Sequence, residues 1–189
     1  MSRVTSILFP GQVRGGNYKP HGGFRFDGSG QTNAATITAA MDASVFRGAR
    51  YLESGQVQYL FDFINACGYM FRLDHLRELS AKFQAIANGF PAAAEGGSQT
   101  TTVSGQTVTA GETIATAVGF TNNVSVDFGV YDLRQRNSAS GDPAWLAGHP
   151  GELASYAVCW FDLLPSADAA RVRSLPASTN DGRVSDYCR

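Results

Sequence analysis

The chain has 189 residues, and its charged side chains nearly cancel, with 15 Lys and Arg against 16 Asp and Glu. This balance gives no electrostatic reason to expect nucleic acid as a partner. No apolar stretch approaches the roughly 20 residues that a membrane-spanning helix needs, so we expect no membrane span. An aromatic content of 11%, beside many glycine, threonine, valine and serine residues, favours a mainly β protein.

Short stretches in which apolar and polar residues alternate predict strands along much of the chain. These strands are expected around residues 4–9, 21–27, 49–53, 57–65, 69–75, 112–118 and 124–133. Glycine, asparagine, aspartate or proline separates them, which is typical of turns between antiparallel strands. The pattern predicts an antiparallel β-sandwich or barrel-like sheet with one or two short helices and an irregular C-terminal tail.

A helix is expected directly after the strand around residues 69–75. Four apolar residues recur there at helical spacing, namely Leu76, Leu79, Phe83 and Ile86, and Gly89 follows as a stop signal. This apolar stripe predicts packing against the sheet rather than a functional role.

The rest of the chain is less regular. Residues from about 90 to 106 are small, polar and rich in glycine, serine and threonine, which predicts a surface loop inserted between strands. We divide the chain into a β domain, residues 1–136, and a C-terminal tail, residues 137–189, that wraps around it. A short helix in the tail is expected to begin near Ser166 and to end before Pro176. Four apolar tail residues are expected to be buried: Trp160, Phe161, Leu163 and Leu164.

The three cysteines are Cys67, Cys159 and Cys188. Their spacing matches no zinc-binding pattern, so a cysteine metal site is not expected. A disulfide between Cys159 and Cys188 would close a loop of about 30 residues and stabilise the fold by about 3 kcal/mol in an oxidising compartment. Three free thiols in a reducing compartment are the alternative, and the sequence leaves both open.

The stretch KPHGGFRFDGSG, residues 19–30, carries the first candidate site residues. In a strand, His21, Arg25 and Asp27 lie on one face and two phenylalanines on the other, because strand side chains alternate. Such a polar face is typical of a metal site, of a metal-free catalytic or binding site, or of a solvated edge.

A second alternating stretch, NVSVDFGVYD, places Ser125, Asp127 and Tyr131 on one face and apolar residues on the other. The apolar face is expected to join the core. The polar face, if it packs beside the strand of His21, forms a polar cleft, with His75 on a neighbouring hairpin.

Four pieces of the chain, taken together, carry a family resemblance. They are HGGFRFD from residue 21, VQYLFDFINACGYMFRLDHLREL from residue 57, VTAGETIATAVGF from residue 108 and NVSVDFGVYDLR from residue 123. In order and spacing they resemble the lysostaphin/LytM-type zinc peptidases, and His75 and Leu76 match the family's His-Leu pair. These endopeptidases cut peptidoglycan cross-bridges and share a β-rich fold, the duplicated hybrid motif. The resemblance implies this fold for about residues 9–79 and 106–134.

Most zinc-binding positions of the family carry other residues here. His21 matches the first ligand, but Arg25 stands where the family has an aspartate, and Ser125 and Asp127 replace its His-x-His pair. A guanidinium stays protonated and cannot coordinate zinc. Asp27 shares a face with His21 but lies about 20 Å further along an extended strand, too far for one ion. The resemblance thus implies a degenerate zinc site, with no metal and no cofactor.

At the former zinc position we expect a salt bridge between Arg25 and Asp127. In one interpretation this bridge only fills the space that the metal leaves. In a second, the cleft binds a ligand, with Arg25, Ser125 and Asp27 as its binding residues. Arg25 holds a carboxylate or sulfate, Tyr131 stacks on a sugar or ring, and His21 with Asp127 supplies directional hydrogen bonds.

In a third interpretation the cleft is a metal-free catalytic site. His21 or His75 acts as general acid or base, Asp127 orients the imidazole, and Tyr131 is the partner acid. Arg25 then neutralises an acidic substrate.

Our leading hypothesis is a non-peptidase module, periplasmic or secreted, that binds cell-wall glycan, wall peptide or a partner protein through this cleft. The alternative is a metal-independent or differently metallated hydrolase or lyase that acts on an acidic polysaccharide or a wall peptide.

Other polar residues are expected to serve the fold. Asp62 and Asn65 precede Gly68 and are predicted to cap a hairpin turn. Arg72 and Asp74 are predicted to form a solvated or cross-strand pair.

Overall fold

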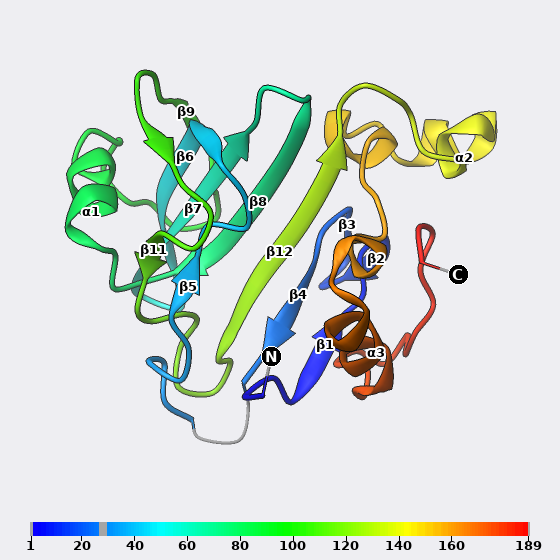
Figure 1. Ribbon diagram of the computed structural model, residues 1–189, viewed down its shortest axis with the longest axis horizontal. Coiled ribbons are helices and arrows are strands. Elements are labelled where there is room, and N and C mark those ends of the chain that lie inside the picture. Colours follow the sequence, from blue (N-terminus) through cyan, green and yellow to red (C-terminus); the bar gives the residue numbers. More distant parts are fainter. Residues whose placement is uncertain (1, 27–29, 189) are drawn as a thin grey trace.

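One large antiparallel sheet forms the centre of the protein (Figure 1). The structure is a computed structural model that describes residues 2–26 and 30–188. The strands of the sheet are β1 (Ser6–Leu8), β4 (Gly22–Arg25), β6 (Ala43–Glu53), β7 (Gln56–Ile64), β8 (Tyr69–Leu76), β9 (Thr101–Thr102), β10 (Thr107–Val108) and β12 (Ser125–Asp132). They pair in the order β1-β4-β12-β8-β7-β6-β10, and β9 also pairs with β6. The predicted mainly β, antiparallel fold is confirmed, and the described sheet stays open rather than closing into a barrel.

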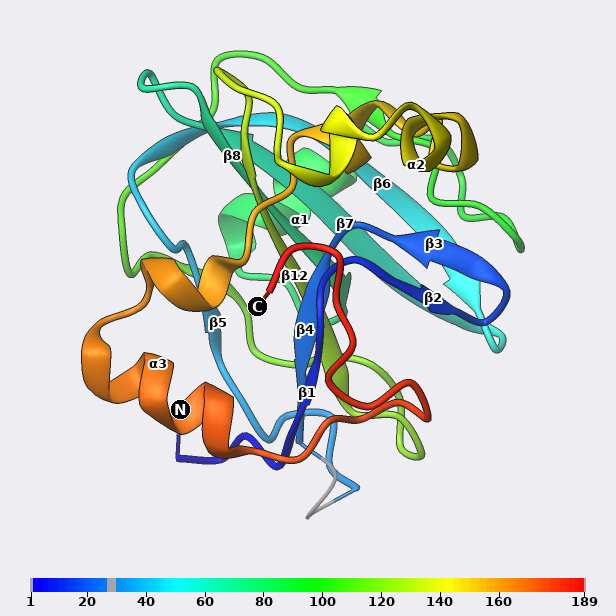
Figure 2. The same ribbon diagram turned by 90° about the vertical axis from the view of Figure 1, so that its right-hand side faces the viewer.

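Two smaller strand pairs accompany the sheet. They are β2 (Gln12–Arg14) with β3 (Asn17–Lys19), and β5 (Ile37–Thr38) with β11 (Thr113–Ala115). The β2–β3 hairpin precedes β4 and projects beside the sheet (Figure 2). Its turn residues, Gly15 and Gly16, have φ values of 56° and 77°. Two consecutive positive φ values are typical of the tight hairpin turns that favour glycine.

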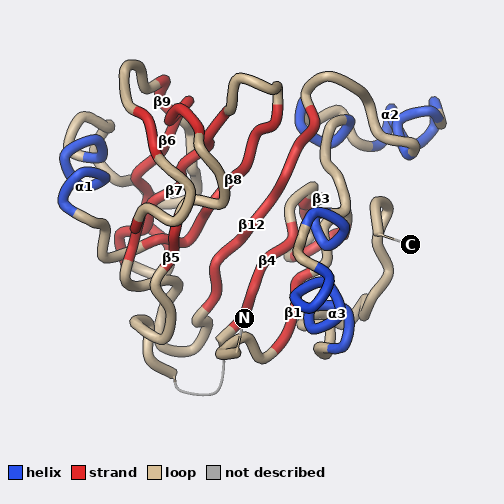
Figure 3. The backbone as a smooth tube through the Cα atoms, in the orientation of Figure 1, coloured by secondary structure: helices blue, strands red, loops and turns tan. Residues whose placement is uncertain are grey.

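Three short α-helices lie around the described sheet (Figure 3): α1 (Ala81–Ala87), α2 (Pro143–Gly148) and α3 (Ser166–Ser174). α1 and α3 occupy the predicted places. Leu76 and Leu79 are not part of α1, however, because Leu76 ends β8 and Leu79 pairs with Ala115 in an isolated bridge. α2 was not expected, although its N-cap Asp142 accepts a hydrogen bond of 2.8 Å from the backbone of Ala144.

One face of the sheet carries the hydrophobic core. Val126 of β12 is 2% exposed and belongs to a cluster that also contains Phe83 of α1 and Trp160 of the tail. Because strand residues alternate between faces, Ser125 and Asp127 point to the opposite face. The predicted split of this strand into an apolar and a polar face is confirmed.

The C-terminal segment packs its aromatic residues into this core. Trp160 and Phe161 are fully buried, as expected, but Leu163 is 55% exposed and Leu164 only half-buried. Trp160, Phe161 and Leu163 share one 3₁₀ turn, Trp160–Leu163, in which successive side chains point about 120° apart, so the turn does not bury all of them. The division of the chain at residue 136 stays a prediction.

A disulfide joins Cys159 to Cys188, 29 residues further along, as one of the two sequence alternatives has it. The last residues of the chain then lie along the β2–β3 hairpin. The side-chain amide of Gln12 donates hydrogen bonds to the carbonyl oxygens of Gly182 and Val184, at 3.0 and 2.6 Å. Within the described ranges, no helix is long and apolar enough to cross a membrane.

Candidate functional site

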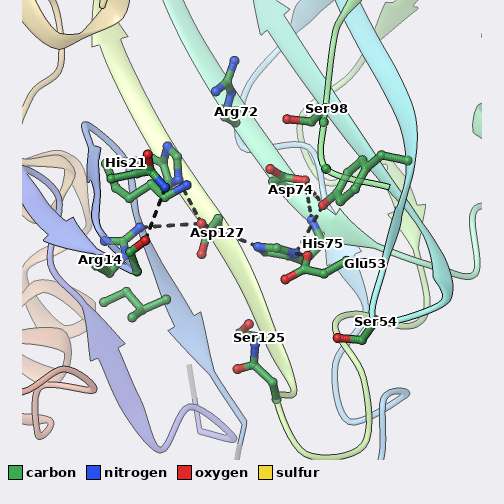
Figure 4. A pocket seen from close by; sticks show the side chains of 18 of the residues that line it. Arg14, His21, Glu53, Ser54, Arg72, Asp74, His75, Ser98, Ser125 and Asp127 are labelled. Atoms are coloured by element: carbon green, nitrogen blue, oxygen red, sulfur yellow. Dashed lines mark hydrogen bonds and ion pairs between the residues drawn. The ribbon is translucent and has the colours of Figure 1, made fainter. Parts of the chain in front are cut away.

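A polar cleft of about 720 Å³ opens over the polar face of β12 (Figure 4). Ser125 and Asp127 of β12 lie on its floor, and residues of β2, β3 and β4 form one wall. The other wall combines the end of β6 with residues 95–98 of the predicted surface loop, which is exposed as expected. A backbone hydrogen bond of 3.0 Å from Leu52 to Ala94 holds this loop beside β6.

Strand pairing brings three of the predicted residues together. Asp127 lies opposite Gly23 on β4 and opposite Asp74 on β8. His21 comes just before β4 and His75 directly follows Asp74, so both imidazoles reach Asp127. A side chain at position 23 would meet a backbone oxygen of β12 at 2.5 Å, and glycine alone permits this close approach.

Asp127 is the centre of the site (Figure 4). Its Oδ2 lies 2.9 Å from Nε2 of His21, 3.6 Å from Nη2 of Arg14 and 3.8 Å from Nε2 of His75. The prediction that Arg25 forms the ion pair with Asp127 is therefore wrong. The β2–β3 hairpin supplies Arg14 instead, and Arg25 lies further along β4.

The other predicted residues have different positions. Ser125 pairs with Arg25 across β12 and β4, and both line the cleft. Tyr131 is fully buried against Met70 and does not line the cleft, so its predicted contact with a ligand is wrong. Its ring lies on the polar face of β12 beyond Gly129, under the tail. Asp27 lies outside the described residues.

His75 has an unusual backbone and a complete set of partners. Its φ of 62° is left-handed, next to a register shift between β7 and β8. Such strain in a residue with a side chain is frequent at functional sites. Nδ1 of His75 lies 2.6 Å from Oε1 of Gln58 and 3.0 Å from Oε2 of Glu53. The hydroxyl of Tyr51 donates to Asp74 at 2.5 Å.

The two histidines have opposite protonation preferences. Burial alone favours the neutral form of His75, but Asp74, Glu53 and Asp127 outweigh it and raise its pKa to about 9. Burial lowers the pKa of His21 despite its hydrogen bond to Asp127. Burial opposes ionisation of Asp127 as well, yet His21, which donates a hydrogen bond to it, and the charges of His75 and Arg14 hold its pKa well below the usual range. At neutral pH the site holds an imidazolium at His75, a carboxylate at Asp127 and a neutral ring at His21.

Protonation of His75 is expected to make folding stability depend on pH. Because its pKa is raised, its contribution is complete below the unfolded value of about 6.5 and is lost as the pH rises through about 9. We expect a loss of about 2 kcal/mol, since Glu53 is partly exposed and water screens its attraction. Urea unfolding at pH 6.5, 8 and 10 measures this loss. In a His75→Gln variant the alkaline decrease should be absent, and an equal decrease there would contradict the assignment.

The residues that resemble the family's zinc-binding positions do not fit zinc. Nε2 of His21 donates to Asp127, and Arg25 stands at the place of a third ligand. No group of three or more His, Cys, Asp and Glu side chains in the described part of the chain has the geometry to hold a metal ion. We therefore derive no chemistry through a metal.

Asp62 and Arg72 stabilise the fold, but through contacts that differ from the predicted ones. Asp62, which is fully buried, accepts hydrogen bonds from Arg47 at 2.6 Å and from Arg72 at 2.7 and 2.8 Å. The prediction that Asp62 caps the turn and that Arg72 pairs with Asp74 is wrong. Asn65 does cap the turn, because its side-chain oxygen accepts two backbone hydrogen bonds.

Sequence reasoning missed several residues of the site. Arg14 follows a short alternating stretch and precedes Gly15 and Gly16, a hairpin signal that would have placed its strand. Tyr51 and Glu53 lie on a correctly predicted strand, but no local pattern indicates that they reach His75.

The chain was compared with protein-family models, with curated proteins and with solved structures, and no match was found. The resemblance to the zinc peptidases, and with it the duplicated hybrid motif, stays a prediction.

Proposed function

We propose that this protein is a non-catalytic module that binds a cell-wall peptide in the polar cleft. The observation that carries the proposal is the state of the groups at the centre of the cleft. His21 and Asp127 are hydrogen-bonded to each other, and Nδ1 of His75 is hydrogen-bonded to Gln58, while about 720 Å³ of polar space stays open above them.

A general base needs an available lone pair that faces the substrate. Nε2 of His21 is the donor to Asp127, and Nδ1 is buried without a hydrogen-bond partner among the described residues. Asp127 is a weak base because its pKa is held far below neutrality. His75 is protonated at neutral pH and points Nδ1 at Glu53 and Gln58. These states support binding rather than turnover.

The lining of the cleft favours a peptide over a sugar chain. Apart from the two imidazoles, Tyr51 contributes the one aromatic ring among the described lining residues, and it is buried, with its hydroxyl bound to Asp74. Sugars are typically held against exposed rings, whereas peptides need hydrogen-bonding groups and charges of both signs. The cleft offers both signs, for example Lys19 and Glu95.

Two observations support a site outside the cytoplasm. The Cys159–Cys188 disulfide is typical of proteins in oxidising compartments. The sequence resemblance to peptidoglycan endopeptidases points to the cell wall as the source of the peptide.

A metal-independent hydrolase or lyase is the second candidate. The observation in its favour is the pair of imidazoles with opposite protonation preferences that face one carboxylate. In that case His75 would be the general acid, and His21 would have to release Asp127 to act as base.

Calorimetric titration with purified peptidoglycan stem peptides and with peptide-free glycan chains tests the proposal. We expect the stem peptides to bind and to be recovered intact by mass spectrometry. A Ser98→Trp variant, which fills the cleft, should weaken binding by about tenfold or more. Ser104→Trp is the matched control, since Ser104 is exposed on the same loop but away from this cleft.

The other results would reject the proposal. New cleavage products from the peptide or the glycan would support the enzyme instead. Binding of glycan alone would contradict the choice of peptide, and binding of neither would contradict a wall-binding module.

A further inference from the structure

The two walls of the cleft carry opposite charge. The wall built from β2, β3 and β4 holds the cations Arg14, Lys19 and Arg25, and no carboxylate occurs among its described lining residues. The opposite wall holds the carboxylates Glu53 and Glu95, together with Asp74 on β8. Figure 4 shows Arg14 on one side of Asp127, and Glu53 and Asp74 on the other.

Neighbouring side chains do not neutralise the charges of the two walls. The imidazolium of His75 balances one carboxylate of the acidic wall, and the buried Asp62 is shared by Arg72 and Arg47, so these three groups together balance at most one more. Glu95 is exposed, and among the described residues its carboxylate accepts a single hydrogen bond, of 3.3 Å, from the backbone of Gly55. A surplus of negative charge therefore remains on this wall.

The cationic wall offers an ammonium group at Lys19. Arg14 adds positive charge beside it but is committed to the protein, because its Nη1 donates to the carbonyl oxygen of Phe9 at 2.9 Å and its buried Nη2 faces Asp127 at 3.6 Å. Lys19 lines the cleft and forms no ion pair with any described residue. His75 and, more weakly, Lys19 lower the pKa of Glu53. The positive charge of Lys19 therefore reaches Glu53 across the cleft, although the two side chains form no ion pair.

We infer that the cleft orients a peptide by charge, with a carboxylate of the peptide at Lys19, on the wall that also carries Arg14, and an ammonium group at Glu95 and Glu53. This inference rests on the proposed function and adds the class of ligand, a short peptide segment that carries both charges. Opposite walls select such a ligand, because either charge in the reversed direction would meet its own sign. An acidic polysaccharide would be repelled by the acidic wall.

Chemically blocked peptides test the orientation. Titrations use a purified peptidoglycan stem peptide with free amino and carboxyl groups, a version with acetylated amino groups and a version with amidated carboxyl groups. Each block is expected to weaken binding to the wild type by about fivefold, the range of one partly exposed ion pair.

Matched variants locate each charge. Glu95→Gln should weaken binding of the unmodified peptide by about fivefold and should have no further effect on the acetylated peptide. Lys19→Gln should weaken binding of the unmodified peptide by about fivefold and should have no further effect on the amidated peptide. Lys82→Gln and Glu78→Gln, which remove one charge of each sign away from the cleft, should leave all affinities unchanged.

The outcomes separate this inference from the proposed function. Failure of the wild type to bind the unmodified peptide would reject both. If the acetylated and the amidated peptides bind with affinities within twofold of the unmodified peptide, the charge orientation is rejected. The proposal of a binding module then stands. If Glu95→Gln weakens the acetylated peptide as much as the unmodified one, the ammonium group is not at Glu95, and the inference fails.

Discussion

Replacing Asp127 with alanine is expected to lower the free energy of unfolding by about 3–5 kcal/mol, the cost of removing one partner from a buried ionic cluster. The carboxylate side chain is 10% exposed and lies between His21, Arg14 and His75. Its removal leaves the guanidinium of Arg14 without its counter-charge and takes from the imidazolium of His75 one of three nearby carboxylates. Urea unfolding followed by circular dichroism measures the loss.

An Asp127→Asn variant separates charge from hydrogen bonding. The amide oxygen still accepts from Nε2 of His21, so the loss of stability should be smaller than for alanine. The pKa of His75 should fall from about 9 toward its ordinary value, because Asp127 is one of the carboxylates that raise it. Proton NMR titration of the imidazole measures this fall.

The matched control is Asp181→Ala, since Asp181 is exposed and surface substitutions usually change stability by less than about 0.5 kcal/mol. If Asp127→Ala unfolds like this control, the ionic cluster around Asp127 does not stabilise the fold.

Loss of the Cys159–Cys188 disulfide is expected to cost about 3–4 kcal/mol, from the loop-closure entropy of residues that are 29 positions apart. A Cys188→Ser variant tests this, because Cys188 is only half-buried and tolerates a hydroxyl better than Cys159. Cys67→Ser is the control, since this exposed cysteine is free. Equal unfolding midpoints for the two variants would contradict a stabilising disulfide.

The same variant is expected to weaken ligand binding. The hydroxyl of Tyr18 donates to Asp186 at 2.7 Å, and the indole of Trp145 donates to the same carboxylate at 2.7 Å. These contacts hold the outer side of the β2–β3 hairpin, whereas its inner side presents Lys19 to the cleft. Without the disulfide the last residues are less restrained, so the cationic wall should be less well ordered. Titration of Cys188→Ser below its unfolding midpoint measures the change in affinity.

The local features of this protein could be predicted from its sequence. The alternation from Val124 to Tyr131 placed Val126 in the core and Asp127 on the opposite face, because strand side chains repeat every two residues wherever the strand lies. The helical spacing before Gly89 located α1 for a similar reason. That Asp127 packs beside His21 was expected only if the two strands are neighbours, and the pairing of β4 and β12 makes them so.

Which arginine faces Asp127 depends on long-range packing and could not be predicted from local sequence. Arg25 and Arg14 lie 11 residues apart in the sequence, and their choice depends on how the β2–β3 hairpin packs over β12. The contacts of His75 with Glu53 and Gln58 depend on a register shift between β7 and β8. Alternation assigns a residue to a face, but long-range packing decides whether that face is open, as at Asp127, or covered, as at Tyr131 under Ala157.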